Sequence, residues 1–455
     1  MTTAPPPTET ALRRSVLTAF TLPTLVLGIM HGPEGQVQSV YAKHAGVALT
    51  ALAAAMLFSK MFDAITYPLI GLLSDRSYAR SGTRKGWVIG GAAVSLLGIW
   101  KLMRPPQEID AFYFGLWMSV TYLGWKLMEI PLQAWSYVLS EDYAQRSRVQ
   151  AWRGLAALIG TMLFFGVPYL AVKLGYSDST EIDFRSLGFS AVVCLIVLPL
   201  ATLLAVVHVP DGTAAAPPAA RRFRLSEVIH AVWNNRPLLH LIAAFLPVSL
   251  LGGLMNGVAY LYLDAYLHLS TQFAAIMGLA MLASVVSIPF WSAMAARFER
   301  HRVWAVALIV DGLACGAMSL LEPGAAALPL ALVIYPVITF TTASTVVVYT
   351  MSADIVDHGR LLTGEDHAGL YGAIFVFLQK SVLGVSSALG LAIAGYFGFD
   401  ATASTQTASG ILGIKLPAGI LPGLGLIAAA IIIWSYPLTR ARVAEIQRQL
   451  HKADR

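Results

Sequence analysis

The sequence predicts an all-α membrane protein with twelve transmembrane helices in two six-helix halves. Hydrophobic residues make up 57% of its 455 residues and charged residues only 12%, whereas soluble proteins carry about 25% charged residues. The mean hydropathy is +0.67. So few charges cannot cover the surface of a water-soluble globule of this length, which excludes soluble enzymes, nucleic-acid-binding modules and disordered chains.

Apolar windows of the length that crosses a bilayer, about 20 residues, recur along the whole chain. In residues 1–208, the N-terminal bundle, the predicted spans are 16–42, 46–73, 86–103, 110–139, 149–173 and 186–208. In residues 237–437, the C-terminal bundle, they are 237–267, 271–296, 303–321, 327–353, 368–397 and 411–437. Segment 209–236, rich in Pro, Ala and Arg, is the expected cytoplasmic linker, and 438–455 is a polar tail with helical spacing of its apolar residues.

Basic residues are distributed unequally between the two sides of the predicted membrane. The termini and the loops on their side hold 21 Lys and Arg, and the opposite loops hold six. Because Lys and Arg concentrate in cytoplasmic loops, we expect both termini to be cytoplasmic and the chain to lie in the plasma (inner) membrane. The first dozen residues lack the pattern of a signal peptide, so we expect no processing.

Besides Lys101, Lys173 and Lys415, which are counted above with the loops, four basic residues fall inside predicted spans, where a charge costs about 2.5–3.5 kcal/mol on insertion scales. They are Lys60, Lys126, Arg153 and Lys380. Lys60 stands three residues before Asp63, and Lys126 stands three residues before Glu129, so each base shares a helical face with an acid. Such pairs either neutralise each other or, because intramembrane carboxylates usually mark ion pathways, belong to a coupling site.

Two other groups of charges are candidates. The first span is interrupted at Gly32-Pro33-Glu34-Gly35, which places Glu34 near an unwound segment or at the outer face. On the predicted cytoplasmic side, acids face Arg-rich loops after spans 2, 4 and 10, and we expect these clusters to form a gate. The gate candidates are Asp75, Arg76, Arg84, Glu141, Asp142, Asp354 and Asp357.

At these residues the chain resembles the major facilitator superfamily, and within it the glycoside–pentoside–hexuronide:cation symporter family. The stretch 63–76, the acid before Ile130-Pro131 and the segment from Ser352 to Lys380 match motifs of that family, and the likeness covers most of the chain. The resemblance implies the major facilitator fold, a cation site containing Asp63 with Lys380 beside it, and a substrate site containing Glu129 and Arg153. The further substrate-site candidates are Lys126, Gln133 and Glu34.

The chain departs from the family pattern at two positions. Tyr67 stands where the family's sodium users have a second Asp, and Gln133 stands where an aromatic residue often stacks on the sugar. Hard cations prefer clustered carboxylates and carbonyls, whereas a proton needs one carboxyl group tuned by burial and a nearby base. We therefore expect H+ rather than Na+ as the coupling ion, with Asp63 or Glu129 titrating and Tyr67 nearby.

The predicted function is secondary active, proton-coupled symport of a sugar or sugar acid by alternating access. A cation-coupled carrier of an amphiphile such as a lysophospholipid is the alternative, and a non-transporting membrane sensor is an alternative of another class. An enzyme is not expected, because no metal-binding His/Glu motif or nucleophile motif is present. We expect a small-molecule solute and the lipid bilayer as partners, no nucleic acid, no cofactor or metal, and function as a monomer.

Overall fold

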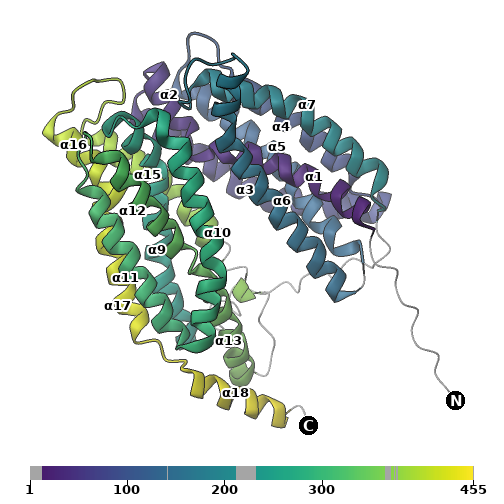
Figure 1. Ribbon diagram of the computed structural model, residues 1–455. Helices are drawn as coiled ribbons and strands as arrows, with labels where there is room; N and C mark the ends of the chain where they lie inside the picture. The colour runs from purple at the N-terminus through teal and green to yellow at the C-terminus, as the bar shows by residue number, and fades with distance from the viewer. Residues whose placement is uncertain are drawn as a thin grey trace. The chain divides into compact units, whose positions relative to one another are not determined.

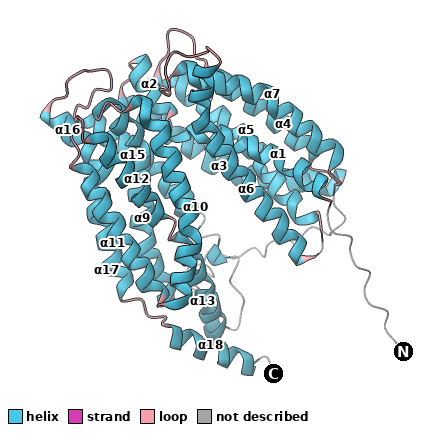
Figure 2. Cartoon of the chain, viewed as in Figure 1, coloured by secondary structure: helices cyan, strands magenta, loops and turns pink. Residues whose placement is uncertain are grey.

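The computed structural model describes residues 13–140, 142–211, 232–363, 370–372, 375 and 378–453. Within these ranges the regular structure is helical throughout and contains no strand (Figure 2). A helix satisfies its backbone polar groups within one segment, which is why long apolar segments fold this way in lipid. The all-α prediction is therefore confirmed.

Ten helices in the described part of the chain are long and apolar enough to cross a membrane. The fourth predicted span is not among the ten. It corresponds to α5 (Ala111–Val138), which has 28 residues but contains Lys126, Glu129 and several Tyr and Trp. The eleventh is described in part and contains the 14-residue α15 (Leu383–Tyr396). With α5 and the described part of the eleventh span, each of the twelve predicted spans contains helix among the described residues.

The chain divides into two compact units, residues 1–37 with 61–219 and residues 38–60 with 220–455. The helices of the N-terminal part are α1 (Arg14–His31), α2 (Val37–Ala45), α3 (Leu49–Ser81), α4 (Lys85–Met103), α5, α6 (Tyr143–Lys173) and α7 (Phe184–His208). Those of the C-terminal part are α9 (Arg236–Leu261), α10 (Phe273–Arg297), α11 (Arg300–Ser319), α12 (Ala327–Thr342), α13 (Thr345–Thr363), α15, α16 (Ala408–Lys415), α17 (Leu421–Trp434) and α18 (Arg440–Ala453).

In the first unit, α4 packs along α5, and α1 packs along α6 (Figure 1). Both contacts depend on glycine. A Cβ on Gly124 of α5 would lie 2.4 Å from the backbone nitrogen of Ser95 in α4, and one on Gly160 of α6 would lie 2.0 Å from the carbonyl oxygen of Leu25 in α1. Small residues allow helix backbones to approach closely in membranes, where van der Waals contact drives association.

In the second unit, α9 packs against α15 and α17, and α11 against α12 and α17. The segment 38–60 belongs to this unit because its side chains contact α15 and the π-helical turn η2 (Tyr262–Tyr266). Lys43 of α2 lies 2.8 Å from the buried carboxylate of Asp264 in η2, and a Cβ on Gly395 of α15 would lie 3.0 Å from Leu49. The polar tail forms α18, as predicted, and packs on α13 (Figure 1).

Two predicted spans are interrupted. The first breaks where the sequence predicts, because α1 ends at His31 and a short 3₁₀ helix, η1 (Gly32–Gly35), follows. The tenth breaks between Thr342 and Thr345, a division the sequence analysis did not predict. There the indole nitrogen of Trp291 in α10 donates a hydrogen bond of 2.6 Å to the carbonyl oxygen of Phe340.

Candidate functional site

The side chain of Lys126 is the centre of a cluster of charged residues within the first unit. Its helix, α5, is capped by Asp110, whose carboxylate accepts a hydrogen bond of 2.8 Å from the backbone N–H of Tyr113. The Lys126 side chain is 8% exposed, and its Nζ lies 3.5 Å from Glu129 Oε2 and 3.9 Å from Asp63 Oδ1. The same ammonium lies 5.3 Å from the centre of the Tyr67 ring.

The predicted pairing of Lys126 with Glu129 is confirmed, and Asp63 of α3 is a second acid beside the same ammonium. A buried charge needs partners to offset the loss of hydration. Here two carboxylates supply that compensation for one base, so removing the positive charge leaves two negative charges close together. Lys126 is thus the shared cationic partner of Asp63 and Glu129.

Glu34 lies at the break after α1, as predicted, and is joined to α5. The Tyr122 hydroxyl donates a hydrogen bond of 3.0 Å to Glu34 Oε1, and His31 Nδ1 lies 3.4 Å from Oε2. The His31 ring lies against the Trp125 ring, with centroids 3.9 Å apart. Since Trp125 directly precedes Lys126 in α5, these contacts connect the end of α1 with the helix that carries the central ammonium.

Arg153 of α6 is 7% exposed and is held by two amides. Its NH1 group donates hydrogen bonds to Oε1 of Gln133 and, at 3.4 Å, to Oε1 of Gln150. The Gln133 amide nitrogen donates in turn to the Tyr137 hydroxyl at 2.6 Å. Arg153 Nε is buried and has no hydrogen-bond partner among the described residues. One donor of this buried guanidinium therefore has no acceptor among the described residues.

The remaining intramembrane bases belong to the second unit. The methylene groups of Lys60 lie against Gly384 of α15, since a Cβ on that glycine would be 2.9 Å from Lys60 Cδ. Lys380 lies in a π-helical turn, η4 (Leu378–Val382), and its side chain falls outside the described residues. Its expected position beside Asp63 therefore stays a prediction.

Among the gate candidates of the first unit, Asp75 and Arg84 are paired. Arg84 NH2 lies 2.9 Å from Asp75 Oδ1, and the guanidinium lies 4.1 Å from the centre of the Tyr78 ring. Burial lowers the pKa of the Arg84 guanidinium, and the Asp75 carboxylate opposes that shift. Arg76 and Asp142 are exposed, and Glu141 falls outside the described residues.

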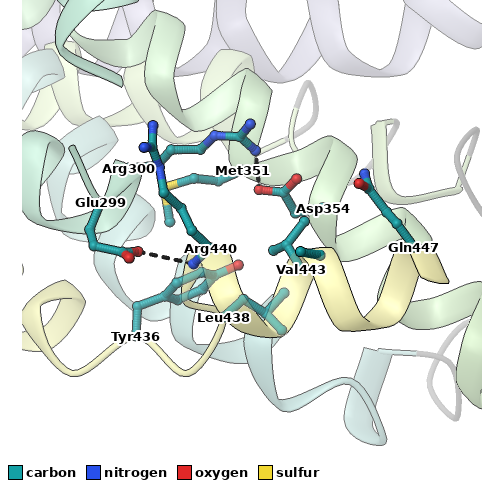
Figure 3. A pocket seen from close by; sticks show the side chains of 10 residues that line it. Glu299, Arg300, Met351, Asp354, Tyr436, Leu438, Arg440, Val443 and Gln447 are labelled. Carbon is teal, nitrogen blue, oxygen red and sulfur yellow. Dashed lines mark hydrogen bonds and ion pairs between the residues drawn. The ribbon is translucent and has the colours of Figure 1, made fainter. Parts of the chain in front are cut away.

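The gate candidates of the second unit lie around a cavity of about 210 Å³ between α11, α13 and α18 (Figure 3). Arg300 donates a hydrogen bond to Asp354 on one side of this cavity. On the other side, the backbone N–H of Arg440 donates to Glu299 at 3.1 Å. Asp357 accepts a bond of 3.3 Å from Gln447 of α18. Both predicted acids of this loop therefore have partners within their own unit.

Three residues of the cluster were not selected from the sequence. Tyr122 is one of them, and its hydroxyl donates to Glu34. His31 and Gln150 were likewise missed. The spacing offered a signal in two cases, since Tyr122 lies one helical turn before Lys126 and Gln150 lies three residues before Arg153.

Comparison with known families identifies the class of protein. The sequence model of the family described as MFS/sugar transport protein matches residues 17–440. The chain belongs to this family. It is therefore a multi-pass membrane transporter of the major facilitator superfamily and not an enzyme.

Relatives of this MFS/sugar transport protein are named as symporters or carriers. It is 24% identical to a glucuronide carrier protein homolog of Escherichia coli, over 90% of this chain and 89% of the relative. It is 26% identical to a putative glycoside/cation symporter of the same organism, over 87% and 85% of the two chains. It is also 22% identical to a sodium-dependent lysophosphatidylcholine symporter of Danio rerio, over 88% and 81%.

The fold is shared with solved transporters. The structure of a D-xylose-proton symporter superposes with a TM-score of 0.63 at 14% identity, over 93% of this chain and 98% of that chain. A nucleoside transporter superposes with a TM-score of 0.65 at 13% identity, over 93% and 100%. At these identities the likeness establishes the major facilitator fold, as the sequence analysis predicts.

Proposed function

We propose that this transporter moves a sugar acid together with a proton. The observation that carries the proposal is the buried ammonium of Lys126, which lies 3.5 Å from Glu129 and 3.9 Å from Asp63. The relatives named as a glucuronide carrier homolog and a glycoside/cation symporter support the solute class. The charges of the cluster support a proton as the coupling ion.

A proton suits this cluster better than a sodium ion does. A hard cation needs several oxygen ligands arranged around it. Here the ammonium of Lys126 already lies beside both acids, and Tyr67 presents a phenol where another carboxylate would add negative charge. Protonation of Asp63 or Glu129 needs no additional ligand, and it weakens the hold of that acid on Lys126.

Arg153 is the proposed site for the carboxylate of the solute. Its guanidinium is buried and oriented by Gln133, and its Nε–H has no partner among the described residues. A planar guanidinium binds a carboxylate through parallel N–H donors, which makes arginine well suited to this ligand. We expect the solute carboxylate to bind Arg153 while the rest of the solute contacts Gln133 and Glu129.

The net charge of the cluster explains why an anion and a proton would travel together. When ionised, Glu34, Asp63 and Glu129 carry three negative charges, and Lys126 and Arg153 carry two positive charges. A proton adds one positive charge and a carboxylate solute adds one negative charge. The loaded and empty clusters therefore carry the same net charge, so both forms meet a similar electrostatic cost within the membrane.

The proposal is tested by uptake of a radiolabelled hexuronate into proteoliposomes. A gradient that is acidic outside should drive accumulation, and a sodium gradient at clamped pH and potential should not. Accumulation driven by sodium alone would overturn proton coupling. Transport of a neutral sugar but of no uronate would overturn the solute class.

Substitutions within the cluster sharpen this test. One of the two substitutions Asp63→Asn and Glu129→Gln, the one that removes the titrating acid, should abolish accumulation driven by the pH gradient while preserving exchange of labelled for unlabelled solute. Arg153→Lys should raise KM roughly ten- to a hundredfold, because a hydrogen bond to a charged group contributes about 1.5–3 kcal/mol. Asp178→Asn is the matched control, since Asp178 pairs with Arg185 in an exposed loop and its side chain is 93% exposed.

An amphiphilic solute is the second candidate. The α3 helix, which carries Asp63, exposes a row of apolar side chains at helical spacing, including Phe58, Met61 and Ile65. Such a row would accommodate an acyl chain, and one relative is named as a lysophosphatidylcholine symporter. Inhibition of hexuronate uptake by lysophosphatidylcholine at concentrations below micelle formation would favour this candidate.

We further propose that the protein works as a monomer in the plasma (inner) membrane with both termini cytoplasmic. The excess of Lys and Arg in the loops on the side of the termini supports this orientation. Cysteine labelling from outside intact cells tests it. A cysteine at Thr402, in the exposed loop before α16, should react with a membrane-impermeant reagent, and a cysteine at Arg448 in α18 should not.

A further inference from the structure

A buried carboxylic acid lies in the second unit, apart from the cluster around Lys126. Asp311 of α11 is 6% exposed and lines a cavity of about 60 Å³. The cavity lies between α9, α11 and α17 and the break that separates α12 from α13. Its lining is mainly apolar, with Thr341, Thr342, Ser344 and Thr345 supplying hydroxyl groups from the break.

A negative charge on Asp311 would have no cationic partner in the described lining of this cavity. Among the described residues that line the cavity there is no Lys, Arg or His. The titratable groups near Asp311 among the described residues include a thiol and a phenol. Cys315 Sγ lies 4.0 Å from Asp311 Oδ1, and Tyr335 of α12 lies near Cys315. An ionised carboxylate without a cationic partner is strongly disfavoured in such surroundings and takes up a proton instead.

The hydrogen bonds at the break also indicate a protonated acid. Thr342 Oγ1 lies 2.8 Å from the carbonyl oxygen of Ile338 and 3.2 Å from Asp311 Oδ2. A threonine hydroxyl has one proton to donate and lone pairs that accept. When that proton goes to the nearer oxygen of Ile338, the contact with Asp311 is a hydrogen bond only if the acid is the donor.

The neighbouring hydroxyl is engaged in the same way. Thr341 Oγ1 lies 2.9 Å from the carbonyl oxygen of Val337 and 2.8 Å from that of Ile338. Its proton is thus committed to the last turn of α12. Neither threonine can donate a hydrogen bond to an ionised Asp311 without giving up a bond to its own helix.

We infer that Asp311 is a proton-binding site of the second unit, and that its proton is donated to Thr342 at the break between α12 and α13. With the proton present, the acid joins α11 to the end of α12. Without it, a negative charge would face apolar side chains, and water or a rearranged break would be needed to stabilise it. The inference concerns a group outside the proposed transport site and does not rest on proton-coupled uptake.

Infrared difference spectroscopy tests the inference on the purified full-length protein. The wild-type spectrum minus that of Asp311→Asn, at neutral pH, should contain the carbonyl stretch of one carboxylic acid, and this band should shift in D2O. Asp178→Asn is the control, since an exposed, ion-paired acid should contribute only carboxylate bands. A difference spectrum that shows only carboxylate bands for Asp311 would overturn the inference.

A second variant keeps the test independent of whether Asp311→Asn folds. Thr342→Val retains the acid but removes its acceptor, so the acid band of the otherwise unchanged protein should move to higher frequency. An unmoved band would contradict donation to Thr342. Loss of the acid band when sodium chloride replaces choline chloride would assign the cavity to a sodium ion, and would overturn the proton site whatever drives uptake.

Discussion

The Tyr122 hydroxyl donates a hydrogen bond to Glu34 and thereby joins the middle of α5 to the break that follows α1. Glu34 is the acceptor, so a phenylalanine at position 122 removes the donor and little volume. Because a hydrogen bond to a charged group contributes about 1.5–3 kcal/mol, Tyr122→Phe should destabilise the protein by that amount. Thermal unfolding in detergent measures the effect. Tyr113→Phe serves as the control, since the Tyr113 hydroxyl donates to the exposed backbone carbonyl of Lys101.

Lys126 should be more costly to remove alone than together with one of its acids. Lys126→Ala leaves Asp63 and Glu129 close together without their shared base, and breaking a buried pair in this way costs about 3–5 kcal/mol. Adding Glu129→Gln should recover part of that loss. A double-mutant cycle from denaturant unfolding gives the coupling, and strictly additive effects would show that the two residues do not interact.

Gly160 should tolerate no side chain, whereas Gly154 on the same helix should accept one. A Cβ at position 160 would lie 2.0 Å from the Leu25 carbonyl oxygen, and a Cβ at position 154 would meet nothing within 4 Å. Gly160→Ala should therefore cost about 1–3 kcal/mol by forcing α1 and α6 apart. Gly154→Ala should stabilise the helix by up to about 1 kcal/mol. Equal melting temperatures for the two variants would contradict the observed packing.

Asp75 should control how readily a reagent reaches the buried side chains beside it at the end of α3. Asp75→Asn removes the negative partner of Arg84, whose guanidinium is 5% exposed. We expect a cysteine placed at Ser74, which is 1% exposed, to react faster with maleimide in the Asp75→Asn background. Arg80→Gln, a change at an exposed position of the same helix, is the control. An unchanged labelling rate would argue against a gating role for Asp75.

Glu322 should make a small contribution to stability that depends on pH. Lys415 and Tyr266 donate hydrogen bonds to its carboxylate, and these bonds lower the pKa of Glu322. The ionised form is thus favoured in the folded protein, so its contribution is present above the unfolded-state pKa and lost as pH falls through the folded-state pKa. Since the group is largely exposed, Glu322→Gln should cost at most about 1 kcal/mol at neutral pH and nothing in acid. The free energy of unfolding of the two proteins, measured from neutral to acidic pH, checks the sign of this pH dependence.

The sequence predicted the elements of the site better than their contacts. Spacing along α5 was enough to pair Lys126 with Glu129, since both lie on one helical face. The second acid, Asp63, comes from α3, and no periodicity within one helix shows which other helix will lie beside it. For the same reason the bonds from Tyr122 to Glu34 and from Arg153 to Gln133 were not predicted.

The two helix breaks illustrate a similar limit. Gly32 and Pro33 mark the first break, because both residues disfavour a continuous helix. The break before Thr345 has no Gly or Pro, and its only local signal is a run of Thr, Ala and Ser within an apolar span. Its bonds to Trp291 and Asp311 come from other helices, so the break depends on tertiary contacts.

The close approach of α4 and α5 at Gly124 has a practical value for measuring motion. A backbone nitrogen that would lie 2.4 Å from an added Cβ shows that the two helix backbones are in close contact at this point, as in a densely packed interior. We therefore expect the distance between α4 and α5 to stay constant, so that it can serve as a reference distance. A pair of spectroscopic labels with one label on α4 or α5 and the other at the end of α1 would report displacement of the Glu34 segment. A pair with one label on α4 and the other on α5 would report no displacement.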